Sequence, residues 1–502
     1  MKTLAVRLNP LGKEIQTKEG SPLIDILHEY GVEFPCGGQG TCGKCKVKVL
    51  QGEIETNQSH QDKLKELDLG VEWRLACLST CSTDLVLEIG QYESIIQADE
   101  SSFEFTPGHG FGIAFDLGTT TLVGQLLDLS TGKILAVETG LNPQKIYGSD
   151  LITRMETSLR NGGEEMTRII RAKLGEMVEM MMVGRQRTLD RMVIIGNSVM
   201  QHFFCGYDVT PLSFYPFESP HIEMAHFTSE DLGWKNVACR HVRFYPSIES
   251  FVGSDILAGI FATGMHMKAE YSLLIDLGTN GEIVLGNHHR LLCASTAAGP
   301  AFEGAKISQG MQATTGAISS ILPDKDGWKC RVIGNGESKG ICGSGLIDAV
   351  SILLEKGLLA QYGEIVSGES EIELDTKVKL SQKDIQEFQL AKAAIATGIE
   401  ILLGKAGIGY HDVKDVYIAG GFGSYINLEN VIRVGMLVFP EEIMHKLGNS
   451  ALIGGKMFLF EDKKLPEEIL KITEHVSLEA DPDFQDIFIE SLAFTGFESK
   501  CK

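Results

Sequence analysis

The chain has 502 residues and a formal net charge of −22, and 43% of its residues are hydrophobic. This length allows about two to four domains with large cores. The acidic excess argues against nucleic acid as a partner, because phosphate binding needs an excess of Lys and Arg. No apolar run approaches the roughly 20 residues that span a bilayer, and the N-terminus lacks the apolar segment of a signal peptide. We therefore expect a cytoplasmic protein without a membrane partner.

The first predicted domain, residues 1–92, contains four cysteines with the spacing of a metal centre. Cys36, Cys42 and Cys45 follow the pattern C-x5-C-x2-C, and 31 residues separate Cys45 from Cys77. Three thiolates in one loop and a distant fourth suit a 2Fe-2S cluster. The glycines of the loop let backbone N–H groups turn inward toward the sulfur atoms. The sequence therefore predicts a 2Fe-2S cluster on these four cysteines, with a spacing that resembles adrenodoxin-like ferredoxins.

Two alternatives remain at this site. A structural zinc site usually carries two C-x2-C pairs, whereas only Cys42 and Cys45 form such a pair. Cys81 could replace Cys77 as a ligand, but the Arg-Leu-Ala-Cys context favours Cys77. Six other cysteines are scattered and are expected to be core or loop thiols: Cys205, Cys239, Cys293, Cys330, Cys342 and Cys501.

The remaining elements of residues 1–92 predict a β-grasp ferredoxin fold. Two N-terminal strands form a hairpin, and a helix follows with Ser21 as N-cap and Pro22 at its first position. After the cluster loop, one strand covers residues 44–52 and another covers residues 85–90. Residues 93–110 are rich in polar and acidic residues and end in Pro-Gly-His-Gly, as expected of a linker.

The next part of the chain contains an internal repeat. An apolar strand followed by Asp-Leu-Gly-Thr and a second strand occurs at Asp116 and again at Asp276. Such a repeat, 160 residues apart, predicts two similar lobes that face each other, residues 111–270 and 271–502.

The repeated Asp-Leu-Gly-Thr suits phosphate chemistry. Glycine allows close approach of the backbone, and N–H groups and the threonine hydroxyl donate to phosphate oxygens. The aspartate can hold Mg²⁺ or orient an attacking water, so we expect Asp116 and Asp276 to be catalytic. A later strand leads into a Gly-Gly turn with a preference for phosphate or nucleoside. The expected nucleotide-binding residues are Gly118, Thr119, Thr120, Gly278, Thr279, Asn280, Gly299, Gly343, Gly420 and Gly421.

Together these three segments resemble the phosphate-1, phosphate-2 and adenosine motifs of the acetate and sugar kinase–heat-shock ATPase–actin superfamily. The resemblance covers most of residues 111–460. It implies an α+β and α/β multidomain protein: a β-grasp 2Fe-2S ferredoxin domain, a linker, and a two-lobed actin-like ATPase. In that fold ATP lies between the lobes and is coupled to their closure.

Further motifs are similar to those of the ATP-dependent reductive activators of corrinoid proteins. They are residues 142–155, 195–204, 293–311, 340–350 and 389–403. The resemblance implies reduction of an inactive Co(II) corrinoid to Co(I) on a corrinoid protein of a methyltransferase system. The electron would pass from a low-potential donor through the 2Fe-2S cluster, and Mg²⁺ and ATP would drive the step. Because actin-like lobes often pair, a homodimer is a further expectation.

Three other functions stay open. The chain could inject electrons into another low-potential acceptor, act as a small-molecule kinase with a regulatory ferredoxin module, or act as a redox sensor. His202, His288 and His289 could contact a corrinoid or nucleotide, although core or loop positions are the simpler interpretation. Residues 389–403 predict a core helix in which Lys392 could point toward nucleotide.

Overall fold

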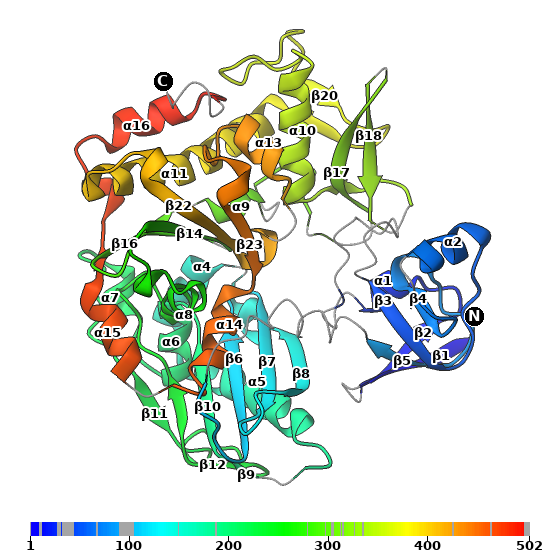
Figure 1. Ribbon diagram of the computed structural model, residues 1–502, viewed down its shortest axis with the longest axis vertical. Coiled ribbons are helices and arrows are strands. Elements are labelled where there is room, and N and C mark those ends of the chain that lie inside the picture. Colours follow the sequence, from blue (N-terminus) through cyan, green and yellow to red (C-terminus); the bar gives the residue numbers. More distant parts are fainter. Residues whose placement is uncertain are drawn as a thin grey trace.

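The protein consists of a small N-terminal domain beside two larger lobes, as a computed structural model shows (Figure 1). The structure describes residues 2–9, 13–27, 32, 45–66, 69–89, 105–148, 150–185, 188–278, 280–296, 298–302, 306–311, 313, 316–325, 327–333, 336–423, 426–461 and 464–495.

The N-terminal domain is built on a five-stranded mixed sheet of order β2-β1-β5-β3-β4. β1 pairs antiparallel with β2 and parallel with β5, which is the β-grasp arrangement that the sequence predicts. Leu4, Val6 and Leu8 alternate along β1 and are buried, so one face of the sheet forms the core. Its elements are β1 (Thr3–Asn9), β2 (Lys13–Lys18), α1 (Leu23–Leu27), β3 (Lys46–Gln51), α2 (Gln58–Glu66), β4 (Trp73–Leu75), the 3₁₀ turn η2 (Ala76–Leu78) and β5 (Leu85–Ile89).

The predicted start of the first helix is wrong by one residue. Pro22 was expected at the first helical position, but α1 begins at Leu23. Pro22 instead forms an isolated antiparallel β-bridge with Thr80, and the carbonyl of Ser21 accepts a 2.8 Å hydrogen bond from the Cys81 amide. This pairing with a distant segment holds Pro22 outside the helix.

The first lobe surrounds a six-stranded sheet of order β11-β13-β10-β6-β7-β8. β6, β7 and β8 form an antiparallel meander, and β10 and β13 add parallel strands beside β6. The strands are β6 (Phe111–Leu117), β7 (Thr121–Asp128), β8 (Ile134–Leu141), β10 (Arg191–Ile195), β11 (Ala225–Phe227) and β13 (Val242–Phe244); β9 (Thr188–Leu189) and β12 (Ala238–Cys239) pair separately. The helical segments are η3 (Pro143–Tyr147), α4 (Leu151–Asn161), α5 (Glu164–Met181), α6 (Ser198–Cys205), α7 (Thr210–Ser213), α8 (Ser254–Thr263) and η4 (Met265–Met267).

The second lobe repeats this design in a sheet of order β23-β22-β14-β15-β16-β24. β14 pairs antiparallel with β15 and parallel with β22, as β6 does with β7 and β10. β6 and β14 also share one burial pattern, with Asp116 and Asp276 both at the sixth position. The two-lobed actin-like architecture is therefore confirmed. The strands are β14 (Tyr271–Leu277), β15 (Gly281–Gly286), β16 (Leu291–Thr296), β22 (Val413–Ala419), β23 (Met444–Gly448) and β24 (Thr473–His475).

Helices and an insertion, a separate three-stranded sheet within residues 317–341, complete the second lobe. The predicted core helix at residues 389–403 is part of the 25-residue α11 (Gln382–Ala406), which begins with a capping box of Ser381 and Asp384. The other elements are α9 (Gly299–Phe302), β17 (Ala317–Asp324), β18 (Gly327–Val332), β19 (Gly340–Ile341), α10 (Gly343–Glu355), β20 (Glu371–Glu373), β21 (Lys379–Ser381), η5 (Tyr410–Asp412), α12 (Gly420–Gly423), α13 (Leu428–Arg433), η6 (Glu441–Ile443), α14 (Ser450–Met457), α15 (Lys464–Ile472), η7 (Leu478–Ala480) and α16 (Phe484–Ser491).

The two lobes meet through α8 and α14, which follow the outer parallel strands β13 and β23. The helices approach closely at Gly454, where a Cβ atom would lie 2.0 Å from the carbonyl oxygen of Ala258. Buried side chains of both lobes form one hydrophobic cluster around this contact. The packing of α8 on α14 therefore holds the two lobes together. It also places Asp255 of α8 near Asn449, which caps α14.

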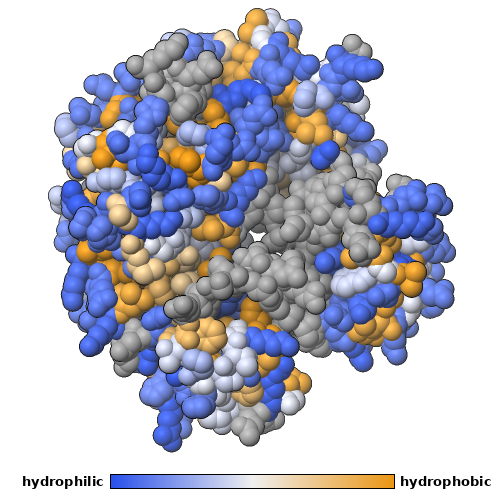
Figure 2. Space-filling model, viewed as in Figure 1, coloured by the Kyte–Doolittle hydropathy of each residue, from blue (hydrophilic) through white to orange (hydrophobic). Residues whose placement is uncertain are grey.

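The core of the N-terminal domain continues into the insertion of the second lobe. Ala317, Ile333 and Cys342 are buried and belong to the same hydrophobic cluster as the β-grasp core. The two parts are therefore packed against each other. Elsewhere, Figure 2 shows hydrophilic side chains over most of the visible face, with smaller hydrophobic areas between them. None of the described helices combines the length and apolar character that a membrane span requires.

Candidate functional site

Two of the four predicted cluster cysteines meet at one edge of the β-grasp sheet. Cys45 precedes β3 and Cys77 lies in η2, and their Sγ atoms are 3.1 Å apart. This separation is too long for a disulfide and brings two thiols to one point, as a shared metal centre requires. The Sγ of Cys81 instead contacts the carbonyl oxygen of Thr83 at 3.4 Å. Cys36 and Cys42 lie outside the described residues.

Four acidic side chains gather where the lobes join. Asp116 and Asp276 lie one residue before the ends of β6 and β14. Asp255 lies in the first turn of α8, and Glu282 follows the phosphate-2 turn in β15. Sequence reasoning identified Asp116 and Asp276 but missed Asp255 and Glu282. Glu282 stands within the second repeat, whereas no local pattern singles out Asp255.

Electrostatics couple these carboxyl groups. Burial raises the pKa of Asp116 to about 6, while a hydrogen bond from Asn449 opposes the shift. Burial and the Asp116 charge raise the pKa of Asp276 to about 7. Burial, and then the charges of Asp276 and Asp116, raise the pKa of Asp255 to about 7. The pKa of Glu282 is well above its ordinary value for similar reasons. The cluster therefore favours a bound cation or shared protons over full ionisation.

A second repeat supplies polar partners to this cluster. Gly-Asn-Ser occurs at residues 196–198 and again at residues 448–450. Asn197 caps α6 and donates from Nδ2 to Thr119 Oγ1 at 3.0 Å. Asn449 caps α14 and donates from Nδ2 to Asp116 Oδ2 at 2.7 Å. Ser450 Oγ lies 3.4 Å from Asp276 Oδ2, so the start of α14 contacts the aspartates of both lobes.

The phosphate-1 segment forms a tight turn between β6 and β7. A Cβ on Gly118 would lie 2.5 Å from the Thr121 carbonyl oxygen, so the turn requires glycine. Thr119 is buried, with its hydroxyl on Asn197. The carbonyl of Thr120 accepts from the Asn142 amide at 2.8 Å. The turn is thus held by two polar residues from later segments.

The phosphate-2 and adenosine segments lie beside each other. The Gly278 amide donates to the Asn280 carbonyl at 3.0 Å, and Thr279 lies outside the described residues. Gly420 has φ of +86° and begins α12, which also contains Gly421; a Cβ on Gly420 would lie 2.7 Å from Asp276 Oδ1. The predicted Gly-Gly segment therefore approaches the second aspartate directly.

The other predicted glycines open helices of the second lobe. Gly299 begins α9, and Gly343 begins α10 next to Cys342, which belongs to the N-terminal hydrophobic cluster. Lys392 donates to the Ala493 carbonyl and lies over the Phe494 ring, so it faces the C-terminal segment.

The histidines occupy a core position and a surface position. His202 is buried, with Nδ1 2.7 Å from the Ser198 carbonyl and Nε2 2.7 Å from Ser219 Oγ. His288 and His289 are exposed, and Nδ1 of His288 lies 2.8 Å from the Lys268 carbonyl.

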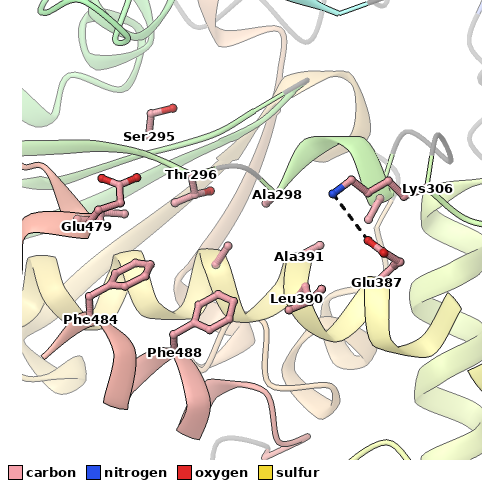
Figure 3. A pocket seen from close by; sticks show the side chains of 13 residues that line it. Ser295, Thr296, Ala298, Lys306, Glu387, Leu390, Ala391, Glu479, Phe484 and Phe488 are labelled. Carbon is pink, nitrogen blue, oxygen red and sulfur yellow. Dashed lines mark ion pairs between the residues drawn. The ribbon is translucent and has the colours of Figure 1, made fainter. Parts of the chain in front are cut away.

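A separate pocket of about 210 Å³ lies between α11 and α16 and contains none of the four carboxylates. Figure 3 shows Phe484 and Phe488 of α16 at this pocket, with the ion pair of Lys306 and Glu387 on another side. The Lys306–Glu387 distance is 3.8 Å. The lining of the pocket is mostly apolar and contains no residue of the phosphate-1 or phosphate-2 turn.

The acidic cluster fits Mg²⁺ held through water and phosphate oxygens. Within the described ranges, no three His, Cys, Asp or Glu side chains converge closely enough to ligate a metal directly. Mg²⁺ commonly keeps several waters and binds through one or two carboxylates together with substrate phosphates. Asp116 and Asp276, which face each other across the lobe junction, suit this mode.

Fold and site together define an iron–sulfur ferredoxin joined to a two-lobed actin-like ATPase. Family models match along the chain: a 2Fe-2S iron-sulfur cluster binding domain at residues 6–82, the RACo middle region at 111–268, and the C-terminal ASKHA domain of RACo at 270–501.

Known proteins match over the same span. The corrinoid activation enzyme RamQ of Eubacterium limosum is 29% identical over 96% of this chain and 98% of its own. A [Co(II) methylated amine-specific corrinoid protein] reductase of Methanosarcina barkeri is 26% identical over 76% of this chain and 77% of its own. A solved structure of a reductive activator for corrinoid, iron-sulfur protein covers 98% of both chains with 25% identity and a TM-score of 0.66. The chain belongs to this family of reductive activators of corrinoid proteins.

Proposed function

We propose that this protein uses ATP to reduce an inactive Co(II) corrinoid to Co(I) on a corrinoid protein of a methyltransferase system. The observation that carries the proposal is the presence, in one chain, of a cysteine centre and an interlobe carboxylate site. One electron from a low-potential donor converts Co(II) to Co(I), the donor is oxidised, and ATP is hydrolysed to ADP and phosphate. Electron transfer and ATP hydrolysis are separate reactions, and a conformational change of the protein couples them.

Cys36, Cys42, Cys45 and Cys77 would hold the 2Fe-2S cluster. When bound, such a cluster supplies a one-electron carrier of low potential, at roughly −400 mV for plant-type ferredoxins. The proximity of the Cys45 and Cys77 thiols supports this assignment. Their burial among apolar side chains limits access of water and oxygen to the sulfur atoms.

In the ATPase, Asp116 and Asp276 would hold Mg²⁺ through its waters. Asp255 has a pKa of about 7 and is suited to accept a proton from the attacking water. The turns at Gly118–Thr120 and Gly278–Asn280 would donate N–H and hydroxyl groups to phosphate oxygens. Gly420 and Gly421, in the segment that resembles the adenosine motif, would contact the nucleotide, and Gly420 adjoins Asp276.

Coupling would arise at the start of α14. Asn449 and Ser450 contact Asp116 and Asp276 respectively, so a cation or phosphate that changes either aspartate also changes the lobe contact. ATP can drive the reduction only if it binds two lobe arrangements with different affinity. The lobe arrangement would then determine how the ferredoxin domain and the corrinoid protein approach each other.

We also propose a domain organisation and a cellular location for the protein. Residues 1–92 form the electron carrier, 93–110 the linker, and 111–270 and 271–502 the two ATPase lobes. We place the protein in the cytoplasm, where a reducing environment keeps cysteine thiols available as cluster ligands.

The test is anaerobic absorption spectroscopy of the full-length, cluster-loaded protein mixed with a Co(II) corrinoid protein and a strong reductant. The Co(I) band is expected with Mg-ATP and not without it. Equal Co(I) formation with and without Mg-ATP would contradict the proposal.

A further inference from the structure

Several apolar side chains next to the phosphate-1 turn are exposed. Leu141 ends β8, Ile146 lies in η3 and Ile152 lies in α4, with exposed fractions of 57%, 74% and 67%. Leu159, seven residues after Ile152 on α4, is also exposed. We name these four residues the 141–159 surface. Exposed apolar residues on consecutive packed elements mark an interaction site more often than isolated ones do.

A buried polar layer beneath this surface is bonded to the phosphate-1 turn. Asn142 is completely buried; its Nδ2 donates to the Gly118 carbonyl at 3.0 Å and its amide donates to the Thr120 carbonyl at 2.8 Å. Its Oδ1 accepts from the backbone amide of Gln144 at 2.9 Å, so Asn142 also caps the start of η3. The turn and the exposed segment therefore share one residue that bonds both.

A second connection runs through Arg154. This residue is completely buried in α4; its Nε donates to the Gly148 carbonyl at 2.9 Å and an amino nitrogen lies 3.8 Å from Met200 Sδ. The Met200 amide donates to Asn197, which in turn donates to Thr119. The other amino nitrogen of Arg154 has no partner among the described residues. Movement of α4 would therefore change the contacts of Thr119 as well as those of Gly118.

The charge and position of this surface favour a protein partner that must also reach the ferredoxin domain. Lys145 and Arg160 balance Asp150 and Glu156, so the exposed charges of residues 141–160 cancel on a chain with net charge −22. An area without net charge exerts little long-range repulsion on a partner of either sign, unlike the rest of this acidic chain. Figure 1 shows β8 at the edge of the first-lobe sheet on the side where the ferredoxin domain lies.

We propose that the 141–159 surface docks the corrinoid protein, and that Asn142 and Arg154 transmit this docking to the phosphate-1 turn. The inference rests on the proposed function and adds the location of its partner. Reciprocity follows: if docking shifts the phosphate-1 turn, ATP must change partner affinity by the same factor as the partner changes ATP affinity.

The test compares full-length wild type with the double variant Ile146→Asp, Ile152→Asp. The probe is a purified Co(II) corrinoid protein that the wild type reactivates, with binding measured by sedimentation velocity. The variant is expected to bind the corrinoid protein at least tenfold more weakly, because charges replace two apolar side chains that docking would bury. Val183→Asp is the matched control, because Val183 is 73% exposed on the same lobe but lies outside the surface; it should bind like wild type.

The outcomes separate the two proposals. If the wild type reactivates the corrinoid protein and the double variant binds it equally well, the docking surface is wrong while the proposed function stands. If the wild type reactivates no corrinoid protein, the proposed function fails first. If the double variant only dissociates a dimer of this chain, the surface is a self-interface and the inference is overturned.

A second variant tests transmission rather than docking. Asn142→Ala removes the side-chain bonds to the Gly118 carbonyl and the Gln144 amide, but it leaves the backbone bond to Thr120 and the exposed side chains of the surface in place. It is expected to retain partner binding within about threefold in the absence of nucleotide, while the effect of Mg-ATP on partner affinity falls toward none. An unchanged ATP effect in this variant would overturn the role of Asn142.

Discussion

Asn449 donates a 2.7 Å hydrogen bond to Asp116, which lies 333 residues earlier in the chain. The second lobe therefore supplies a hydrogen-bond donor to the aspartate of the first lobe. The same residue caps α14, and the next residue, Ser450, contacts Asp276. One helix start therefore contacts both aspartates. Any change at these carboxylates on nucleotide binding must be accommodated by α14 and hence by its packing on α8.

Asn449→Ser should uncouple the lobes. Serine retains the helix cap but does not reach Asp116, so the free energy of unfolding should fall by about 1–2 kcal/mol and ATP should stimulate Co(II) reduction less. Asn427→Ser is the matched control, because Asn427 caps α13 and, among the described residues, bonds to neither aspartate. Chemical denaturation and anaerobic spectroscopy of both variants provide the measurement. Equal losses in the two variants would assign the effect to capping alone.

The buried carboxylates predict a pH-dependent stability in the protein free of Mg²⁺ and nucleotide. The pKa of Asp276 is raised to about 7, so the folded state keeps a proton that the unfolded chain has released above about pH 4. This contribution to stability is present at low pH and is lost as pH rises toward about 7. Asp276→Asn should therefore be more stable than wild type at pH 8, by about 1–3 kcal/mol.

Denaturation curves at pH 5, 6, 7 and 8 test this sign. The advantage of Asp276→Asn should shrink as pH falls to 5, and Mg²⁺ should stabilise only the wild type at pH 8. An advantage that is constant across the range would show that Asp276 does not titrate in the folded protein near neutrality.

Gly454→Ala should impair the lobe contact. Its Cβ would lie 2.0 Å from the backbone oxygen of Ala258, which cannot move without displacing α8. We expect a loss of about 1–3 kcal/mol in unfolding free energy and slower ATP-dependent reduction. Gly455→Ala in the same helix meets only the end of the Ile195 side chain, at 3.0 Å, and serves as the control. If the two variants behave alike, close packing at Gly454 is not important.

Cys77→Ser and Cys81→Ser should differ in cluster content. Cys77 adjoins the Cys45 thiol, whereas Cys81 contacts a backbone carbonyl. Visible absorption and iron analysis should show loss of the 2Fe-2S cluster in Cys77→Ser and retention in Cys81→Ser. The reverse result would exchange the two ligands.

The sequence predicted the parts of the site that are encoded locally. Each Asp-Leu-Gly-Thr follows its own strand, so Asp116 and Asp276 could be placed without knowledge of the fold. Asp255 and Asn449 could not, because each comes close to these aspartates only through the packing of α8 on α14. The repeated Gly-Asn-Ser was the available signal for Asn449. Pro22 was misplaced for a similar reason, since its position depends on a bridge to distant Thr80.

The central claim is that the carboxylate site drives electron transfer from the ferredoxin domain. The most direct measurement is the rate of Co(I) formation, with Mg-ATP, by wild type and by Asp276→Asn carrying equal amounts of 2Fe-2S cluster. We predict that the variant is reduced normally by dithionite but forms Co(I) no faster than wild type without ATP. Equal rates for the two proteins with Mg-ATP would contradict the account.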